Sequence, residues 1–288
     1  VAPSLYVTKN ICCSETSYVS GDTIPYTITV GHNPNSSSTA YNLVLTDTTT
    51  APGVSAANIS IQNVSITFNP PIPTNSFTLN TNYTINNNVL TINSMNNPAS
   101  PIILPLGYTL IIKYNVTLLT DPTGPITNNV GLVWSNSLNG PPNPPASANT
   151  SLSIGQPSLY MNKQTCCNQS VYSSGNSIPY TITIGHNPTS QANAYNLNIV
   201  DTISGVLPAN VSIQNVNTSF NPSYAGTINS NIVNNVLTIT SPELPLGYQI
   251  IVSYNVLLTA DPTGNLTNTA VLNYKNIVGT ELPTITKT

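Results

Sequence analysis

Pro3-Ser-Leu-Tyr-Val-Thr-Lys-Asn-Ile-Cys-Cys13, followed by Gly21-Asp-Thr-Ile-Pro-Tyr-Thr-Ile-Thr-Val-Gly-His-Asn-Pro34, is a stretch that occurs twice in the chain. The second copy runs from Pro157 to Pro188 and begins 154 positions after the first. The two copies align without a gap. A period this long indicates a duplicated whole domain, because solenoid units repeat at roughly 20–50 residues.

The duplication covers nearly the whole chain of 288 residues. Further segments match in the same order: Ala40–Thr48 with Ala194–Thr202, Asn58–Val64 with Asn210–Val216, Leu104–Tyr108 with Leu244–Tyr248, and Asp121–Gly124 with Asp261–Gly264. The offset has fallen to 140 at the last pair. The second copy therefore has shorter connections, as expected for surface loops. We predict two domains, 1–155 and 156–288.

Apolar and polar residues alternate along most of each copy, and clusters of Asn, Gly and Pro separate the alternating runs. This pattern predicts β-strands, and no segment shows a sustained helical stripe. In the first copy, strands are expected around Leu5–Val7, Ile24–Val30, Tyr41–Leu45, Ile59–Phe68, Leu90–Ile92, Tyr108–Val116, Val130–Trp134 and Ala148–Ile154. The predicted fold class is all-β, with two tandem Ig-like β-sandwiches of seven to eight strands each.

The composition excludes some classes of function. Charged residues make up 5% of the chain, there is no Arg, and the net charge is −3. Nucleic-acid binding is excluded, because no basic patch is available to contact phosphates. No apolar run approaches the roughly 20 residues that span a bilayer. A neutral surface rich in Asn, Ser and Thr suits a durable, self-associating material; biased base composition is the alternative explanation.

Four motifs carry a resemblance to a known family: a first strand that bears Lys9, Gly21-Asp-Thr-Ile-Pro-Tyr-Thr-Ile-Thr-Val30, Asn42-Leu-Val-Leu-Thr-Asp-Thr48 and Leu266-Thr-Asn-Thr-Ala-Val271. They resemble the surface-repeat family called domain of unknown function 11. This resemblance implies tandem Ig-like sandwiches on bacterial and archaeal surface proteins. The size, the duplication and the Cys-Cys pairs are also similar to the ribbon-appendage proteins of clostridial spores.

We therefore expect an extracellular, non-enzymatic subunit of a spore or cell-surface fibre, whose main partners are copies of itself, with other surface or appendage proteins as further candidates. The terminal segments Val1–Lys9 and Gly279–Thr288 are candidates for strand exchange with a neighbour. Two other classes stay open: an adhesin or ligand-binding stalk module, and an S-layer or archaeal filament protein.

Polar residues interrupt the inward-facing series of three strands. Residues two apart on a strand share a face, which places these polar residues on the core side. They are Lys9 after Leu5 and Val7, Asp47 after Tyr41, Leu43 and Leu45, and Asn128 before Val130, Leu132 and Trp134. The second copy repeats the pattern with Lys163, Asp201 and Asn268.

Burying an unpaired charge is expensive, so these residues are expected to meet. Burial lowers the pKa of a lysine and raises that of an aspartate. A neutral amine next to a protonated acid can attack the Asn carboxamide, and ammonia leaves. The hypothesis is a spontaneous isopeptide bond from Lys9 to Asn128 and from Lys163 to Asn268, with Asp47 and Asp201 as the acids. It would tie the first strand to the last. Related surface domains are similar in using such a trio. The alternative is a buried Lys–Asp ion pair capped by the Asn amide.

The four cysteines form two adjacent pairs, Cys12 with Cys13 and Cys166 with Cys167. Neighbouring side chains in an extended segment point in opposite directions. Equivalent loops of tandem sandwiches should also lie too far apart for a disulfide between the pairs. Bridges between subunits, vicinal disulfides and reduced thiols stay open. Zinc is disfavoured by the spacing.

Sequons for N-glycosylation are frequent, but an Asn-, Ser- and Thr-rich chain yields a similar number by chance. They begin at Asn35, Asn58, Asn63, Asn82, Asn115, Asn149, Asn168, Asn210, Asn217 and Asn265. His32 and His186 are interpreted as turn residues, because no second metal ligand adjoins either. We identify no cofactor site, no metal site and no catalytic signature.

Overall fold

The computed structural model describes residues 2–12, 18–19, 21–72, 77–78, 80–93, 101–166 and 169–288. The chain divides into two compact units, unit 1 from Val1 to Ile154 and unit 2 from Gly155 to Thr288. The predicted boundary after residue 155 lies one residue beyond this division. Each unit has its own apolar core.

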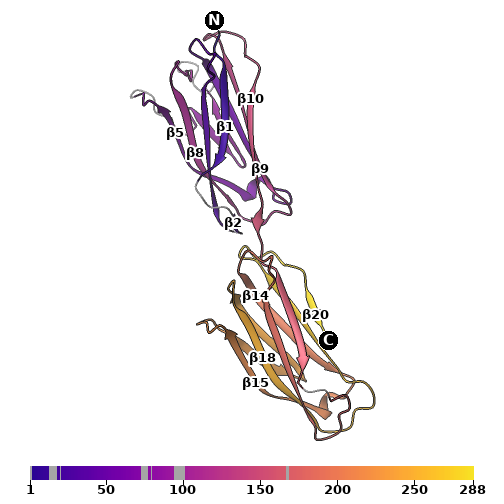
Figure 1. Cartoon of the computed structure of the whole chain (residues 1–288). Helices are drawn as coiled ribbons and strands as arrows, with labels where there is room; N and C mark the ends of the chain where they lie inside the picture. The colour runs from indigo at the N-terminus through magenta and orange to yellow at the C-terminus, as the bar shows by residue number, and fades with distance from the viewer. Residues whose placement is uncertain are drawn as a thin grey trace. The chain divides into compact units, whose positions relative to one another are not determined.

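Unit 1 is a sandwich of two antiparallel sheets (Figure 1). The four-stranded sheet has the order β1-β3-β8-β5, with β1 (Leu5–Ile11), β3 (Thr23–His32), β8 (Thr109–Leu118) and β5 (Ile59–Asn69). The five-stranded sheet has the order β10-β9-β4-β7-β6, with β10 (Ala146–Leu152), β9 (Ile126–Ser135), β4 (Tyr41–Thr50), β7 (Val89–Asn93) and β6 (Tyr83–Asn86). Short elements are β2 (Tyr18–Val19), the 3₁₀ turn η1 (Ala56–Asn58) and β11 (Ile154–Gly155).

Unit 2 repeats this arrangement. Its four-stranded sheet has the order β12-β13-β18-β15, with β12 (Leu159–Thr165), β13 (Ser177–His186), β18 (Gln249–Leu258) and β15 (Val211–Asn221). Its five-stranded sheet has the order β16-β17-β14-β19-β20, with β16 (Asn229–Val233), β17 (Val236–Leu244), β14 (Ala194–Ser204), β19 (Thr267–Lys275) and β20 (Ile285–Lys287). The 3₁₀ turn η3 spans Pro208–Asn210.

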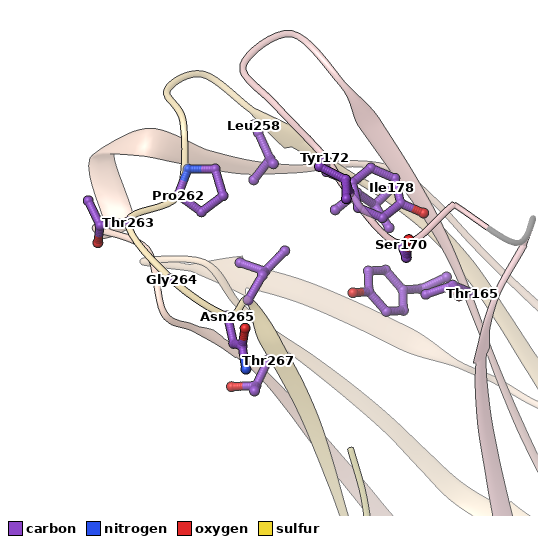
Figure 2. A pocket seen from close by; sticks show the side chains of 13 residues that line it. Thr165, Ser170, Tyr172, Ile178, Leu258, Pro262, Thr263, Gly264, Asn265 and Thr267 are labelled. Carbon is purple, nitrogen blue, oxygen red and sulfur yellow. The ribbon is translucent and has the colours of Figure 1, made fainter.

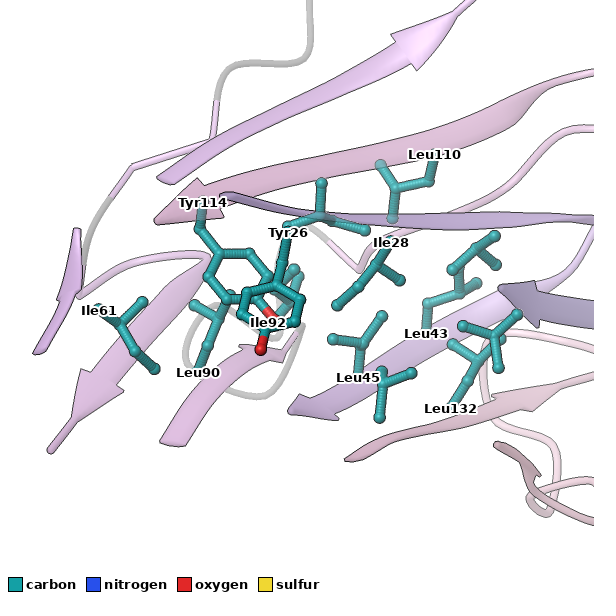
Figure 3. Packing of buried hydrophobic residues seen from close by; sticks show 14 of the residues in the cluster. Tyr26, Ile28, Leu43, Leu45, Ile61, Leu90, Ile92, Leu110, Tyr114 and Leu132 are labelled. Atoms are coloured by element: carbon teal, nitrogen blue, oxygen red, sulfur yellow. The ribbon is translucent and has the colours of Figure 1, made fainter. Parts of the chain in front are cut away.

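The alternating pattern produces this architecture, because every second residue of a strand faces the other sheet. In β3, Ile24, Tyr26, Ile28 and Val30 are all buried, while the residues between them are not. Figure 3 shows the resulting core of unit 1, where side chains from both sheets meet. The prediction of tandem all-β Ig-like sandwiches is confirmed. In each unit the two sheets hold nine strands within the described residues, because the short hairpin strands β6 and β16 were not anticipated.

A β-bulge corrects one predicted inward series. The pairing of β4 with β9 shifts register between Tyr41 and Val44, and Asn42 has a left-handed φ of 54°. Asn tolerates this conformation, and the extra residue breaks the alternation. Tyr41 is consequently half-buried, whereas Leu43 and Leu45 are buried. The equivalent Tyr195 of β14 is also half-buried beside the same irregularity.

The proposed exchange segments are paired within their own units. β1 pairs with β3, and β20 pairs with β19. Among the described residues, no helix is long and apolar enough to cross a membrane.

Candidate functional site

The three polar residues predicted to meet in unit 1 do meet. Lys9 lies on β1 in the four-stranded sheet, while Asp47 on β4 and Asn128 on β9 lie in the five-stranded sheet. Their exposed fractions are 5%, 0% and 0%. The cluster therefore joins the two sheets through the core.

Tyr114 of β8 lies at the centre of this cluster. The Lys9 ammonium forms an ion pair with Asp47 Oδ1 and donates to Tyr114 Oη at 2.6 Å. Tyr114 Oη donates to Asp47 Oδ2 at 2.5 Å, and Asn128 Nδ2 donates to Tyr114 Oη at 2.8 Å. One hydroxyl thus contacts the amine, the acid and the carboxamide.

Two stacked rings enclose the amine of Lys9. The rings of Tyr26 and Tyr114 have centroids 5.6 Å apart and an interplanar angle of 17°, and they lie side by side within the apolar cluster (Figure 3). Lys9 Nζ lies 5.2 Å from the Tyr26 centroid and 5.3 Å from the Tyr114 centroid. The faces of aromatic rings attract a cation, but they solvate it less well than water does.

The burial shifts the acid–base balance of the pair. Desolvation lowers the pKa of Lys9 from 10.5 to about 8, against the opposing effect of Asp47. Desolvation also raises the pKa of Asp47, against the opposing effect of Lys9. Both shifts favour the neutral amine and the neutral acid, because low polarity penalises charge. Burial next to Asp47 also raises the pKa of Tyr114 well above its usual range, so its hydroxyl stays protonated.

Unit 2 contains a second copy of the site. Lys163 on β12 forms an ion pair with Asp201 Oδ1 on β14. Tyr254 Oη on β18 donates to Asp201 Oδ2 at 2.6 Å and accepts from Asn268 Nδ2 on β19 at 2.9 Å. Burial lowers the pKa of Lys163 as well. Tyr180 stacks on Tyr254 with centroids 5.5 Å apart.

The two copies differ in one contact of the ammonium. Lys9 donates to a tyrosine hydroxyl, whereas Lys163 donates to the main-chain oxygen of Asn268 at 2.7 Å. Both amines therefore lie next to the asparagine or its hydrogen-bond partner.

Both carboxamides have an unused oxygen. The Oδ1 atoms of Asn128 and Asn268 are buried and have no hydrogen-bond partner, although each Nδ2 donates to a tyrosine. A buried acceptor without a donor costs free energy. Each carboxamide thus has an oxygen ready to accept a proton or a hydrogen bond.

Two details of the sequence interpretation change. Asn128 and Asn268 lie on β9 and β19, which are followed by β10 and β20, so the site links the first strand to the penultimate one. Tyr114 and Tyr254 were not predicted as site residues. The sequence shows that both tyrosines occupy inward-facing positions of their strands. An inward-facing tyrosine, however, usually indicates a residue of the apolar core.

The cysteine predictions lie partly outside the described residues. Cys12 follows β1 and Cys166 follows β12, and their main-chain N–H groups donate to Pro25 and Pro179. Cys13 and Cys167 lie outside the described residues, so disulfide formation stays a prediction.

None of the described sequon asparagines is buried. Asn35, Asn63, Asn149, Asn217 and Asn265 are exposed, and Asn58, Asn82, Asn115 and Asn210 are half-buried. Asn168 lies outside the described residues. Glycosylation stays a prediction.

The two histidines tie turns to strands. In unit 1, His32 Nδ1 lies 2.7 Å from Ser36 Oγ and Nε2 lies 3.1 Å from the Leu104 carbonyl oxygen. In unit 2, His186 has the same contacts with Ser190 and Leu244 at the same distances. No group of three metal-ligating side chains occurs in the part of the chain that the structure describes.

No family model and no curated protein matches the sequence. The fold is similar to the C-terminal domain of the Streptococcus agalactiae antigen I/II polypeptide BspA, at 10% identity and a TM-score of 0.42, over 97% of this chain and 99% of that one. The C-terminal domain of Streptococcus pyogenes AspA, an antigen I/II-family protein, gives 10% identity and 0.43 over 98% of both chains. The Enterococcus faecalis MSCRAMM ACE, which binds its ligands by the collagen Hug model, gives 10% identity and a TM-score of 0.32, over 99% of this chain and 93% of that one. At these values the likeness says nothing about what this chain binds.

Proposed function

We propose that this chain is a load-bearing module of an extracellular surface protein, in which each unit forms a Lys–Asn isopeptide bond. The bonds join Lys9 to Asn128 and Lys163 to Asn268. The proposal rests on one observation: a buried amine, acid and carboxamide recur in both units, with an equivalent tyrosine between them in each unit. A structural ion pair needs no carboxamide with an unused oxygen, whereas the reaction does.

The chemistry follows from the neighbours of the amine. Proton transfer from the Lys9 ammonium to Asp47 gives a neutral amine and a neutral acid, which burial favours. The Nζ lone pair attacks Asn128 Cγ while the acid donates a hydrogen bond to Oδ1. Asp47 then carries the proton released by the amine to Nδ2, and the C–Nδ2 bond breaks. The products are a secondary amide and ammonia, and Asp47 is left as the neutral acid; it returns to the carboxylate when its proton passes to the departing ammonia, which leaves as ammonium.

A bond at this place would connect the two sheets of a unit covalently. Lys9 belongs to one sheet and Asn128 to the other, so separating the sheets would require breaking the amide. Force applied along the chain would pass from β1 into β9 without unfolding the strands between them. This property suits a protein that is pulled, such as a fibre or a stalk.

The setting is proposed from composition and family resemblance. A neutral surface, with 5% charged residues, and the resemblance to surface repeats support an extracellular subunit that assembles with its own copies, for which a spore appendage is one setting. Bridges through the cysteine pairs are one means of assembly. The second candidate is a stalk module of an adhesin, which the repetition of one sandwich unit within the chain favours.

The mass of the intact, denatured and reduced protein tests the bonds. The expected mass is lower than the sequence mass by two ammonias. Lys9→Ala and Asn128→Ala should each restore one ammonia, and Lys113→Ala should restore none, because Lys113 is exposed on β8. A wild-type mass equal to the sequence mass would contradict the proposal. Electron microscopy of the purified chain then separates the two settings, since only a fibre subunit should form polymers alone.

A further inference from the structure

Buried polar atoms without a hydrogen-bond partner gather around the carboxamide of unit 1. Within the described residues, such side-chain atoms are Thr49 Oγ1, Asn128 Oδ1, Thr150 Oγ1 and Asn268 Oδ1. Thr49 of β4 and Thr150 of β10 both lie opposite Asn128 of β9, one on each side. Residues opposite each other on antiparallel strands share a face, with Cβ atoms about 4.5–5.5 Å apart. Two hydroxyl groups that can donate therefore flank an oxygen that can only accept.

Thr49 comes from the same strand and the same face as the acid. It follows Asp47 by two residues on β4, and both are fully buried. Its main-chain N–H donates to the Asn88 carbonyl oxygen at 3.0 Å, and its carbonyl oxygen accepts from Asn88 Nδ2 at 2.8 Å. These bonds fix the main chain and leave the hydroxyl free to rotate. Because a buried hydroxyl without a partner costs free energy, packing alone would favour valine here.

Tyr114 determines which way the carboxamide points. Its proton is donated to Asp47 Oδ2, so its oxygen accepts from Asn128 Nδ2, and Oδ1 is turned away from the tyrosine. When the Lys9 amine adds to Cγ, the carbon becomes tetrahedral, and Oδ1 leaves the former amide plane and gains negative charge. A donor that is placed for this state, and not for the planar amide, accelerates the reaction.

Unit 2 has the acid and the carboxamide but not this hydroxyl. Ile203 of β14 lies opposite Asn268 of β19, in the register that places Thr49 opposite Asn128 in unit 1. Ile203 is buried on the face of β14 that carries the acid. Its side chain has no hydrogen-bond donor. The two units therefore differ in one donor next to the same reacting group.

The threonine before the carboxamide of unit 2 does not supply the missing donor. Thr267 precedes Asn268 on β19, and neighbouring side chains of a strand point to opposite faces. Thr267 is exposed and lines a pocket at the surface (Figure 2), where its hydroxyl is hydrogen-bonded to that of Ser204. The position of Ile203 is therefore the one at which a hydroxyl would face the carboxamide from β14.

We propose that Thr49 donates a hydrogen bond to Asn128 Oδ1 while the bond between Lys9 and Asn128 forms, an inference that rests on the proposed isopeptide chemistry. As the Nζ–Cγ bond forms, the carbonyl electron pair moves onto Oδ1, where the hydroxyl and the acid stabilise the charge together. The pair returns when the Cγ–Nδ2 bond breaks. Thr49 keeps its proton throughout and is unchanged at the end.

Intact mass measured over time gives the rate of each unit. Full chains from pulsed cell-free synthesis are quenched in acid and denaturant, and the loss of one ammonia is followed in an Asn268→Ala background, where only unit 1 can react. Thr49→Val should slow this loss roughly tenfold to a hundredfold, because a hydrogen bond to a charged oxygen is lost. Thr49→Ser keeps the hydroxyl and should react nearly as fast as the unchanged chain. Thr46→Val, at an exposed position of β4, is the control.

Unit 2 provides the reverse test, in an Asn128→Ala background. Ile203→Thr should accelerate the loss of ammonia, although it removes buried aliphatic surface and weakens the packing. Thr49→Val should slow the reaction of unit 1, although it removes an unpaired hydroxyl and strengthens the fold. Rate and stability that move in opposite directions cannot come from a structural effect alone.

Four results would overturn the role of Thr49. They are an unchanged rate in Thr49→Val, a Thr49→Ser variant as slow as Thr49→Val, an unchanged rate in Ile203→Thr, and a slower reaction in Thr150→Val alone. Each of them leaves the proposed bonds in place. A wild-type chain that loses no ammonia would instead contradict the bonds, and this inference with them.

Discussion

Unit 1 and unit 2 hold the same amine, acid, tyrosine and carboxamide, but different structures surround them. In unit 1, Lys9 is 5% exposed and the neighbouring Tyr26 is buried. In unit 2, Lys163 and the neighbouring Tyr180 are both half-buried. In each unit the lysine lies on the first strand, the acid and the asparagine lie in the facing sheet, and the tyrosine lies in the same sheet as the lysine. The duplication kept the chemistry of the site while the surroundings of the amine changed.

The difference reaches the hydrogen bonds of the amine. Lys9 donates to Tyr114, whose ring is 1% exposed. Lys163 donates to a main-chain oxygen instead, and the flanking Tyr180 is less buried than its equivalent Tyr26. The same reacting groups are therefore held by different hydrogen bonds in the two units.

The largest effect is expected from removing the lysines. In the bonded protein Lys9 is an amide and not a cation, so the main effect of Lys9→Ala is to remove the covalent link, which by analogy with a disulfide closing a loop of roughly 100 residues contributes about 4.7 kcal/mol. Lys163→Ala opens a ring of similar length in unit 2 and should cost a similar amount. Calorimetry that resolves the two units measures both losses, with Lys113→Ala as the control. A loss in one unit alone would indicate that only that unit forms the bond.

A smaller effect is expected from pH in a variant that cannot form the bond. In Asn128→Ala, Lys9 keeps its amine, and burial lowers its pKa from 10.5 to about 8. Between these values the unfolded chain binds more protons than the folded one, so the stability of unit 1 should increase with pH. The increase from pH 8 to 10.5 amounts to at most about 3 kcal/mol. Bonded wild-type protein should lack it, because an amide does not titrate here.

Urea unfolding across this pH range measures the effect, and Asn268→Ala provides the comparison in unit 2. Burial lowers the pKa of Lys163 too, so the sign should be the same. A flat profile in both variants would contradict a lowered lysine pKa.

The smallest effect is expected from a substitution at a position where the two units carry different residues. Thr49 lies opposite Asn128 with a buried hydroxyl that has no hydrogen-bond partner, whereas the equivalent Ile203 lies opposite Asn268. Thr49→Val removes this hydroxyl at nearly constant shape and should stabilise unit 1 by about 1 kcal/mol. Ile203→Thr should destabilise unit 2. Chemical denaturation gives both signs, and a destabilised Thr49→Val would indicate that the hydroxyl has a role.

Strand alternation was sufficient to place the polar cluster. Lys9, Asp47 and Asn128 share a phase with apolar neighbours, and phase alone determines the face of a strand. The duplication strengthened this inference, because the same three residue types recur in phase in the second copy. The all-β fold and the position of the cluster between the sheets could therefore be predicted.

Other features depend on pairing, which a single sequence does not specify. The bulge at Asn42 removed Tyr41 from its expected face. The central role of Tyr114 depends on β8 lying next to β3, and neighbours in a sheet are set by topology.

The separation of Lys9 and Asn128 along the chain has a consequence for proteolysis. With the bond in place, residues 9–128 form a closed covalent ring that includes the surface turn at Asn87–Asn88 and the loop at Pro105–Gly107. A protease that cuts once in such a loop would open the ring but release no fragment. The bonded unit would run as a single species on a denaturing gel after one cut, and two cuts would be needed to lose any part of it.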